Sequence, residues 1–209
     1  MKKDYSSTLK TAVLSFVILL ANAAAAQNWD ANLLEQINPN NPSSDYWKIT
    51  SSSAYWVPAS GILATYFAGA FGKNKMLKKE GYKALFGIAV STALSEAVKF
   101  VINRQRPAFA FPNDIFEGSN TGIQGQSFPS GHTTLAFTYA TLLTMQYHKW
   151  YVTVPAFLWA GSVAYSRMYM GKHYPTDVLA AAVLGTASTW LTYKLNNKLF
   201  KVRPAVKHT

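Results

Sequence analysis

The stretch SRMYMGKHYPTD, residues 166–177, is the part of the chain around which the rest is organised. His173 is followed four residues later by Asp177, and Pro175 stands where a first helical turn would begin. If that turn is helical, the i, i+4 spacing lets Asp177 accept a hydrogen bond from one ring nitrogen of His173. The other nitrogen is then a bare, more basic lone pair. The spacing predicts that His173 is a nucleophilic or metal-binding histidine. The alternative is that Arg167 and Asp177 are interface charges and His173 is a surface histidine.

Apolar segments of helical length lie before and after this stretch. There are five of them: residues 54–71, 84–102, 133–147, 151–165 and 178–193. Of the 209 residues, 49% are apolar and only 14% are charged, below the roughly 25% usual in soluble domains. With no cysteine, the chain has neither disulfides nor a thiolate site. We expect an all-α, membrane-embedded bundle of five to six helices, although a mean hydropathy of +0.01 leaves a soluble helical core open.

The N-terminus has the pattern of an export signal. Lys2, Lys3 and Lys10 precede an apolar core, residues 12–21, and small residues at 24–26 form a cleavage site before Gln27. We predict that residues 1–26 are a signal peptide, or else a first membrane helix that would be the sixth of the bundle. In either case residue 27 emerges on the far side of the membrane.

The polar segment that follows, residues 27–53, contains a short amphipathic pattern. Trp29, Leu33, Leu34 and Ile37 are spaced for a helix that lies at a membrane interface. A simple connecting segment is the alternative.

Basic residues are sorted to one side of the predicted bundle. With residue 27 outside, the lysines at 73–79 and the basic C-terminal tail fall in the cytoplasm, as the positive-inside rule expects. Three cations depart from this trend: Lys48, Arg104 and Lys172. We therefore divide the chain into a periplasmic amphipathic or linker segment (27–53), a helical domain (54–195) and a basic cytoplasmic tail (196–209).

The same topology brings three polar clusters to the outer, periplasmic face. The first holds Lys99, Arg106 and Pro107, with Glu96 one turn away as a possible partner for Lys99. The second is PSGH, residues 129–132, which opens the helix at 133. There, Ser130 and Gly131 would lie at a helix N-terminus with unpaired N–H groups, and His132 would bring a titratable proton.

The third cluster is the opening stretch, with Arg167, His173 and Asp177. Three cations and backbone donors suit a dianionic tetrahedral group such as phosphate. Two histidines suit a nucleophile and an acid on opposite sides of phosphorus. No site of this kind requires a metal, and we expect no cofactor.

These clusters resemble the type 2 phosphatidic acid phosphatase and vanadium haloperoxidase superfamily. The family pattern is Lys-x6-Arg-Pro, then Pro-Ser-Gly-His, then Ser-Arg-x5-His-x3-Asp, and no position is missing between Lys99 and Asp177. The resemblance implies a phosphohydrolase in which His173 attacks phosphorus, Asp177 orients it and His132 protonates the leaving oxygen. It also implies which residues hold the phosphoryl oxygens: Lys99, Arg106, Ser130, Gly131 and Arg167.

The substrate expected at such an outward-facing site is a lipid phosphate or diphosphate whose tail stays in the bilayer. Undecaprenyl diphosphate, phosphatidylglycerol phosphate, phosphatidic acid and a lipid A phosphate all fit, and we expect no nucleic-acid partner. The loop 108–126, with Phe109, Phe111, Ile115 and Phe116, is a candidate lipid-facing rim. A soluble periplasmic acid phosphatase is the main alternative. A vanadate-dependent haloperoxidase and a non-enzymatic lipid-binding or transport protein are further alternatives.

Overall fold

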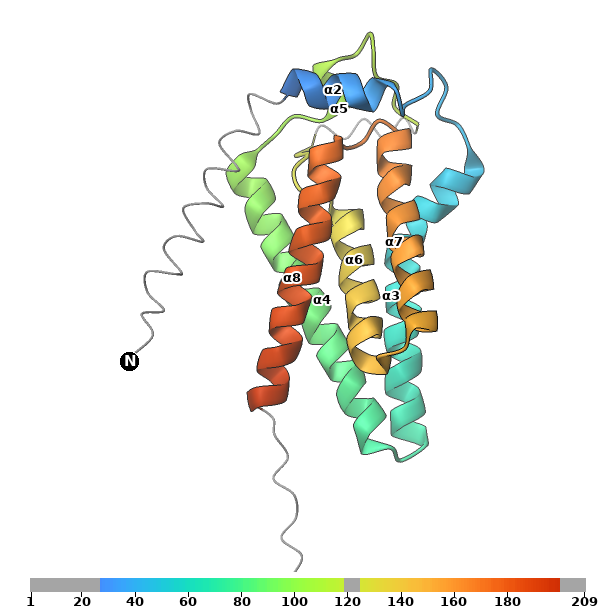
Figure 1. The fold of residues 1–209 in the computed structure, drawn as a ribbon, viewed down its shortest axis with the longest axis vertical. Helices are drawn as coiled ribbons and strands as arrows, with labels where there is room; N and C mark the ends of the chain where they lie inside the picture. The colour runs from blue at the N-terminus through green and yellow to red at the C-terminus, as the bar shows by residue number, and fades with distance from the viewer. Residues whose placement is uncertain (1–26, 119–124, 200–209) are drawn as a thin grey trace, which may run out of the picture.

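The protein is a bundle of helices in the computed structural model, which describes residues 27–118 and 125–199. Within these ranges the helices are α2 (Gln27–Glu35), α3 (Asp45–Phe71), α4 (Lys75–Ile102), α5 (Pro107–Ala110), α6 (Gly131–Tyr147), α7 (Trp150–Tyr169) and α8 (Pro175–Leu199). Five long helices run alongside one another, and the short α2 and α5 lie across one end (Figure 1). The α3–α4 and α6–α7 turns lie toward the opposite end (Figure 1). The segments around residues 103, 130 and 173 therefore meet at the α2 end, as the sequence predicts.

Local sequence signals set the ends of these helices. Asn74 caps α4, its side chain accepting hydrogen bonds from the N–H groups of Met76 and Leu77 at 3.0 and 3.2 Å. α4 ends at Ile102, and the C-cap residue Asn103 adopts a left-handed conformation with φ of 48°. Pro175 is the first residue of α8, where its missing N–H costs no helical hydrogen bond.

The centre of the bundle is α6, which packs against α3, α4, α7 and α8. Its neighbours approach closely because the residues between them are small. One buried cluster consists of Ala54, Ala136, Ala140, Ala156, Ala160 and Val163. Several buried threonines of α6 donate their hydroxyls to main-chain carbonyls, as Thr134 does to Ser130 and Thr141 to Phe137. These hydroxyls are therefore satisfied without water.

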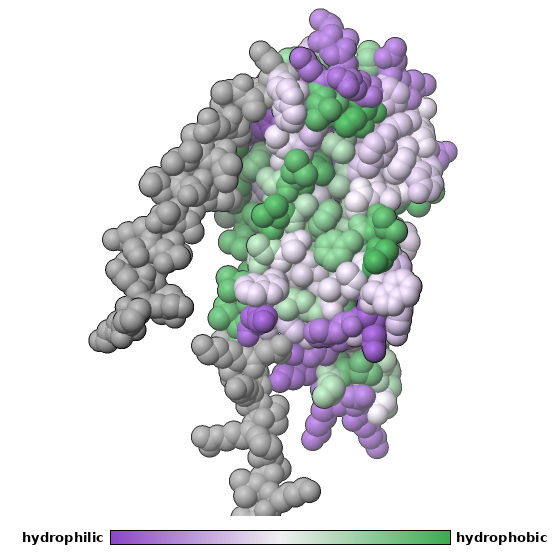
Figure 2. Space-filling view, viewed as in Figure 1, coloured by the Kyte–Doolittle hydropathy of each residue, from purple (hydrophilic) through white to green (hydrophobic). Residues whose placement is uncertain are grey.

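Large apolar side chains face outward instead. Phe71, Phe100, Val101 and Val183 are all more than two-thirds exposed, and Figure 2 shows hydrophobic residues over the middle of the bundle with hydrophilic residues toward both ends. By length and hydropathy, α4 is the one helix of the described part that meets the criteria for crossing a membrane. Small residues inside and large apolar residues outside are typical of a bundle surrounded by lipid. This arrangement favours the membrane prediction over a soluble core.

The five long helices confirm the five predicted segments, although their bounds are wider. α3 begins at Asp45 rather than at residue 54, and α8 continues to Leu199, beyond the predicted end of the helical domain at 195. The signal peptide or first membrane helix at 1–26 and the tail beyond residue 199 lie outside the described residues.

The amphipathic segment forms α2, which packs on the end of the bundle. Leu34 is buried in a cluster with Ala31, Ile115 and Tyr174, whereas Trp29 is 62% exposed. α2 therefore covers the end of the bundle through its Ala31 and Leu34 side. Its place at a membrane interface stays a prediction, because hydrophobic spacing defines an apolar face but not what covers that face.

Candidate active site

The three polar clusters surround one cavity of about 160 Å³. Six of the eight predicted site residues line it: Lys99, Arg106, Gly131, His132, Arg167 and His173. They come from the last turn of α4, the residue before α5, the first turn of α6, the last turn of α7 and the α7–α8 connection. The other two, Ser130 and Asp177, are fully buried next to lining residues. Segments that are distant in sequence thus form a single site.

His173 is held in the connection by a tight turn. α7 ends at Tyr169, and Gly171 then has a φ of 64°, where a side chain would collide with the carbonyl of Phe116. His173 is 2% exposed, and its Nδ1 lies 2.7 Å from the main-chain carbonyl of Ser127. Because a carbonyl oxygen only accepts, Nδ1 carries the proton of the neutral ring. Nε2 therefore holds the lone pair.

The partner of His173 differs from the one predicted. The carboxylate of Asp177 lies 3.7 Å from Nδ1, too far for a hydrogen bond, and the Ser127 carbonyl accepts instead. The reason is that α8 begins at Pro175, so His173 precedes the helix and the helical i, i+4 geometry does not apply. Asp177 instead accepts hydrogen bonds from the Ser127 hydroxyl and from the Tyr174 N–H at 2.9 Å.

Burial keeps His173 neutral. Removal from water lowers the pKa of His173 to about 4; the Asp177 carboxylate opposes this shift, and the Arg167 and Arg106 charges add to it. Between pH 5 and 8 the ring is therefore mostly uncharged, and Nε2 is available as a nucleophile.

The cations of the site have incomplete sets of partners. Arg167 donates from Nη1 to the hydroxyl of Ser51 at 2.6 Å, and its buried Nε has no acceptor within the described ranges. The Nε of Arg106 is likewise buried and unpaired there, and burial lowers the pKa of Arg106. Lys99 contacts Glu96 at 2.7 Å, the partner that the sequence suggested. Buried guanidinium nitrogens without acceptors indicate a site built for an anion.

The start of α6 completes this anion site. Ser130 occupies the N-cap position, yet its side chain does not cap the helix; its oxygen accepts a hydrogen bond from the Thr133 hydroxyl at 3.0 Å. The hydroxyl proton of Ser130 is therefore free to turn toward a ligand. A side chain at Gly131 would lie 3.1 Å from the Lys99 ammonium, so glycine lets this charge approach the helix N-terminus.

His132 contacts a residue that the motifs did not indicate. Its Nδ1 lies 3.4 Å from the hydroxyl of Tyr55 on α3, and the two rings meet edge to face with centroids 4.5 Å apart. Ser95 also lines the cavity, and its buried hydroxyl has no partner among the described residues. Because Ser95 lies one turn before Lys99 on the same face of α4, helical spacing from the motif lysine was the available signal for it.

The candidate lipid-facing rim is not supported where it is described. Ile115 is buried, and Ala108 and Phe111 pack against the same cluster beneath α2. Phe109 and Phe116 are only partly exposed. Ile115, Ala108 and Phe111 therefore fill the space between α2 and the bundle. Residues 119–124 of this loop lie outside the described ranges.

Comparison with known proteins gives consistent matches. The model of the PAP2 superfamily matches residues 80–201. The undecaprenyl-diphosphatase of Sulfolobus acidocaldarius is 27% identical over 191 residues, which cover 88% of this chain and 87% of that protein. A lipid A 1-phosphatase of Porphyromonas gingivalis is 28% identical over 88% of this chain, which spans only 38% of that protein. The transmembrane PAP2-type phosphatidylglycerolphosphate phosphatase of Bacillus subtilis shares the fold, with a TM-score of 0.67, 24% identity and coverage of 92% and 98% of the two chains.

Proposed function

Because the chain belongs to the PAP2 superfamily, we propose that it removes phosphate from a lipid phosphate or diphosphate through a phosphohistidine at His173. One observation carries this proposal: a neutral His173 whose Nδ1–H is donated to Ser127 presents Nε2 to a cavity that also holds Lys99, Arg106 and Arg167. A nucleophile surrounded by cations suits phosphoryl transfer, in which positioning and charge stabilisation supply most of the catalysis.

In the first step, Nε2 of His173 attacks phosphorus and the bond from phosphorus to the leaving oxygen breaks. The three cations, the Ser130 hydroxyl and the first N–H groups of α6 hold the non-bridging oxygens. His132, whose Nδ1 lies 3.4 Å from the Tyr55 hydroxyl, enters this step protonated, with the bound phosphate balancing its charge, and gives its proton to the leaving oxygen. The products are the dephosphorylated lipid and a phosphohistidine.

In the second step, water attacks the phosphohistidine. His132, now neutral, takes a proton from the water as the new oxygen–phosphorus bond forms and the nitrogen–phosphorus bond breaks. His173 leaves as the neutral ring, with its Nδ1–H still donated to Ser127. Inorganic phosphate is released, and both histidines have returned to their starting protonation states.

The relatives guide the choice of substrate. One is named for an undecaprenyl diphosphate and another for the 1-phosphate of lipid A. The large apolar residues on the outside of the bundle, Phe100 and Val101 at the end of α4 among them, would keep the tail of such a lipid in the bilayer. We propose a lipid phosphate or diphosphate of this class as the substrate.

The site is proposed to face the periplasm. Lys73, Lys75 and Lys149 lie at the two turns opposite α2, and the basic end of α8 points the same way (Figure 1). The positive-inside rule places that end in the cytoplasm. The cavity, at the other end, then opens to the outer side.

Variants of the two histidines test the mechanism. His173→Ala should abolish both the phosphoenzyme and turnover. His132→Ala should lower kcat on a lipid phosphate by roughly 10²–10⁴-fold, the usual contribution of general acid catalysis. Its loss should be much smaller on an activated aryl phosphate, whose leaving oxygen needs no proton. Asp177→Asn should lower turnover while leaving phosphate affinity largely intact, because the three cations remain.

The assay is trapping of labelled phosphohistidine, together with phosphate release from a panel of the lipids above. His148→Asn, which changes an exposed histidine at the opposite end of the bundle, is the matched control and should behave as wild type. These roles are wrongly assigned if His173→Ala keeps its activity while His132→Ala loses activity equally on both substrates.

A further inference from the structure

α2 reaches the candidate active site through Asp30. This side chain is completely buried, although the helix that carries it lies at the end of the bundle. Asp30 belongs to none of the three motifs and precedes the residues that match the family model, 80–201. A buried carboxylate is costly unless its charge is paired and its oxygens accept hydrogen bonds. Its partners therefore show what it is for.

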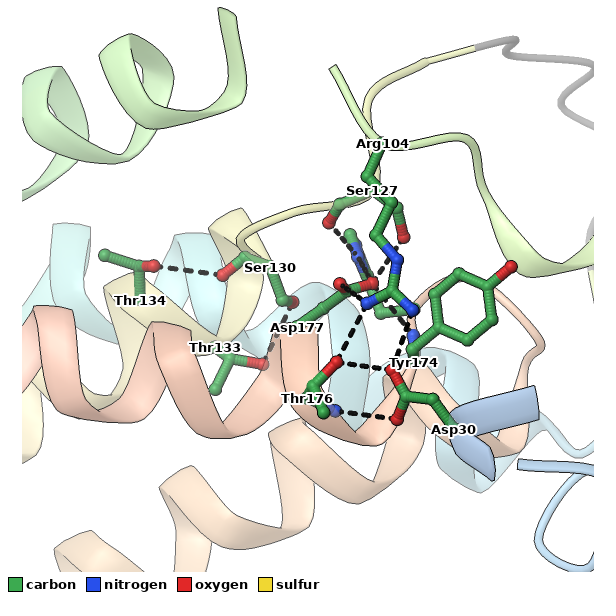
Figure 3. Close-up of polar contacts among 10 residues, drawn as sticks. Asp30, Arg104, Ser127, Ser130, Thr133, Thr134, Tyr174, Thr176 and Asp177 are labelled. Carbon is green, nitrogen blue, oxygen red and sulfur yellow. Dashed lines mark hydrogen bonds and ion pairs between the residues drawn. The ribbon is translucent and has the colours of Figure 1, made fainter. Parts of the chain in front are cut away.

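Those partners lie next to the predicted catalytic residues (Figure 3). One oxygen of Asp30 is 2.8 Å from Nη2 of Arg104 and also accepts the hydroxyl of Thr176. The other oxygen accepts the N–H of Thr176 at 3.1 Å. Nη1 of the same Arg104 donates to Asp177 and to the Thr176 hydroxyl, at 2.8 Å each. Arg104 is thus held between two carboxylates.

The network continues from Asp177 to His173. Asp177 accepts the hydroxyl of Ser127, and the main-chain carbonyl of Ser127 accepts Nδ1–H of His173. The Ser127 N–H in turn donates to the carbonyl of Arg104 at 2.7 Å. Of the residues in this network, His173 alone lines the cavity. The rest do not line this cavity, and Arg104 lines a neighbouring one together with Arg106.

We propose that Asp30 is a positioning residue for the reaction, acting on His173 through Arg104, Asp177 and Ser127. α2 is then part of the catalytic unit rather than a cover. The proposal rests on His173 being the nucleophile. Without the Asp30 charge, Arg104 pairs with only one carboxylate, that of Asp177. Arg104 then fixes the positions of Asp177 and Ser127 less tightly. The lone pair of Nε2 then spends less time aligned with phosphorus.

The test is Asp30→Asn, which keeps the size of the side chain and an oxygen that can accept from Thr176. We expect kcat and the rate of phosphohistidine formation to fall by roughly 10- to 100-fold, the loss usual when a residue that orients a metal-bound histidine is changed. KM and inhibition by inorganic phosphate should stay unchanged, because Lys99, Arg106 and Arg167 are untouched. Glu35→Gln, on the exposed side of the same helix, is the matched control and should show wild-type kinetics.

A double-mutant cycle separates positioning from a general effect on the fold. If Asp30 acts through Arg104, the double variant of Asp30→Asn and Arg104→Gln should lose little more activity than Arg104→Gln alone. Losses that multiply, or a KM that rises with kcat unchanged, would overturn the proposal. If Asp30→Asn fails to fold, Thr176→Val is the variant to measure. A lower kcat at constant KM would support the positioning role of the network, and an unchanged kcat would refute it.

The wild-type protein separates this proposal from the proposed function. If the wild type forms no phosphohistidine, the proposed function itself fails. If the wild type forms it and Asp30→Asn forms it at the same rate, only the role of Asp30 is refuted.

Discussion

The low pKa of His173 predicts an unusual pH dependence. Burial lowers this pKa to about 4, so the neutral ring persists to lower pH than it would for an exposed histidine. At pH 5 roughly 90% of the rings are neutral with a pKa of about 4, against roughly 3% with the ordinary value of about 6.5. Between pH 7 and pH 5, the contribution of His173 to kcat/KM should therefore fall by only about 10%, rather than about 25-fold.

The measurement is kcat/KM between pH 4.5 and 8, because this ratio reports the ionisation of the free enzyme. Two phosphate esters with different second pKa values should be used, since the substrate also ionises in this range. A limb that moves with the ester belongs to the substrate, and one that stays belongs to the protein. The proposed ionisation of His173 would be refuted by one result. In it, the acid limb of the kcat/KM profile has its midpoint near 6.5 with both esters, and this limb disappears in Asp177→Asn.

Three further changes test other parts of the structure. Ser51→Ala removes a hydroxyl that accepts a hydrogen bond from the buried Arg167, so it should destabilise the protein by about 1.5–3 kcal/mol and weaken phosphate inhibition. A wild-type melting temperature and inhibition constant would contradict this. Gly131→Ala places a methyl group 3.1 Å from the present position of the Lys99 ammonium, so KM should rise several-fold with no change in melting temperature. Labelling with a membrane-impermeant thiol reagent tests the topology. Asn113→Cys, in the loop proposed to lie outside, should label in spheroplasts, and Lys75→Cys should not. The reverse pattern would refute the orientation proposed above.

The helices and the motif residues could be predicted because both leave local signals. Apolar runs such as 133–147 have the length of a helix, and the spacing from Lys99 to Arg106 or from His173 to Asp177 lies within a short stretch. The sorting of lysines then placed the three clusters at one end. These signals are sufficient to assemble six of the residues that line the cavity.

The contacts behind the site could not be predicted in this way. Arg104 pairs with Asp30 across 74 positions, and Thr176 contacts Asp30 across 146. No periodicity links residues so far apart. The sequence indicated Arg104 only as a cation that departs from the positive-inside trend. The predicted hydrogen-bond partner of His173 was wrong for a local reason. Because α8 begins at Pro175, His173 lies two residues before the helix and helical spacing does not apply to it.

The contacts of Asp30 also bear on when the protein becomes active during its synthesis. Asp30 leaves the ribosome early, Arg104 follows after most of α4 has been inserted, and Thr176 emerges only with α8. Until α8 arrives, Asp30 can pair with Arg104 but lacks both hydrogen bonds from Thr176. A nascent or truncated chain that lacks α8 contains His173, which precedes this helix, but neither Thr176 nor Asp177. We expect assembly of the final helix to be the step that completes the network behind His173.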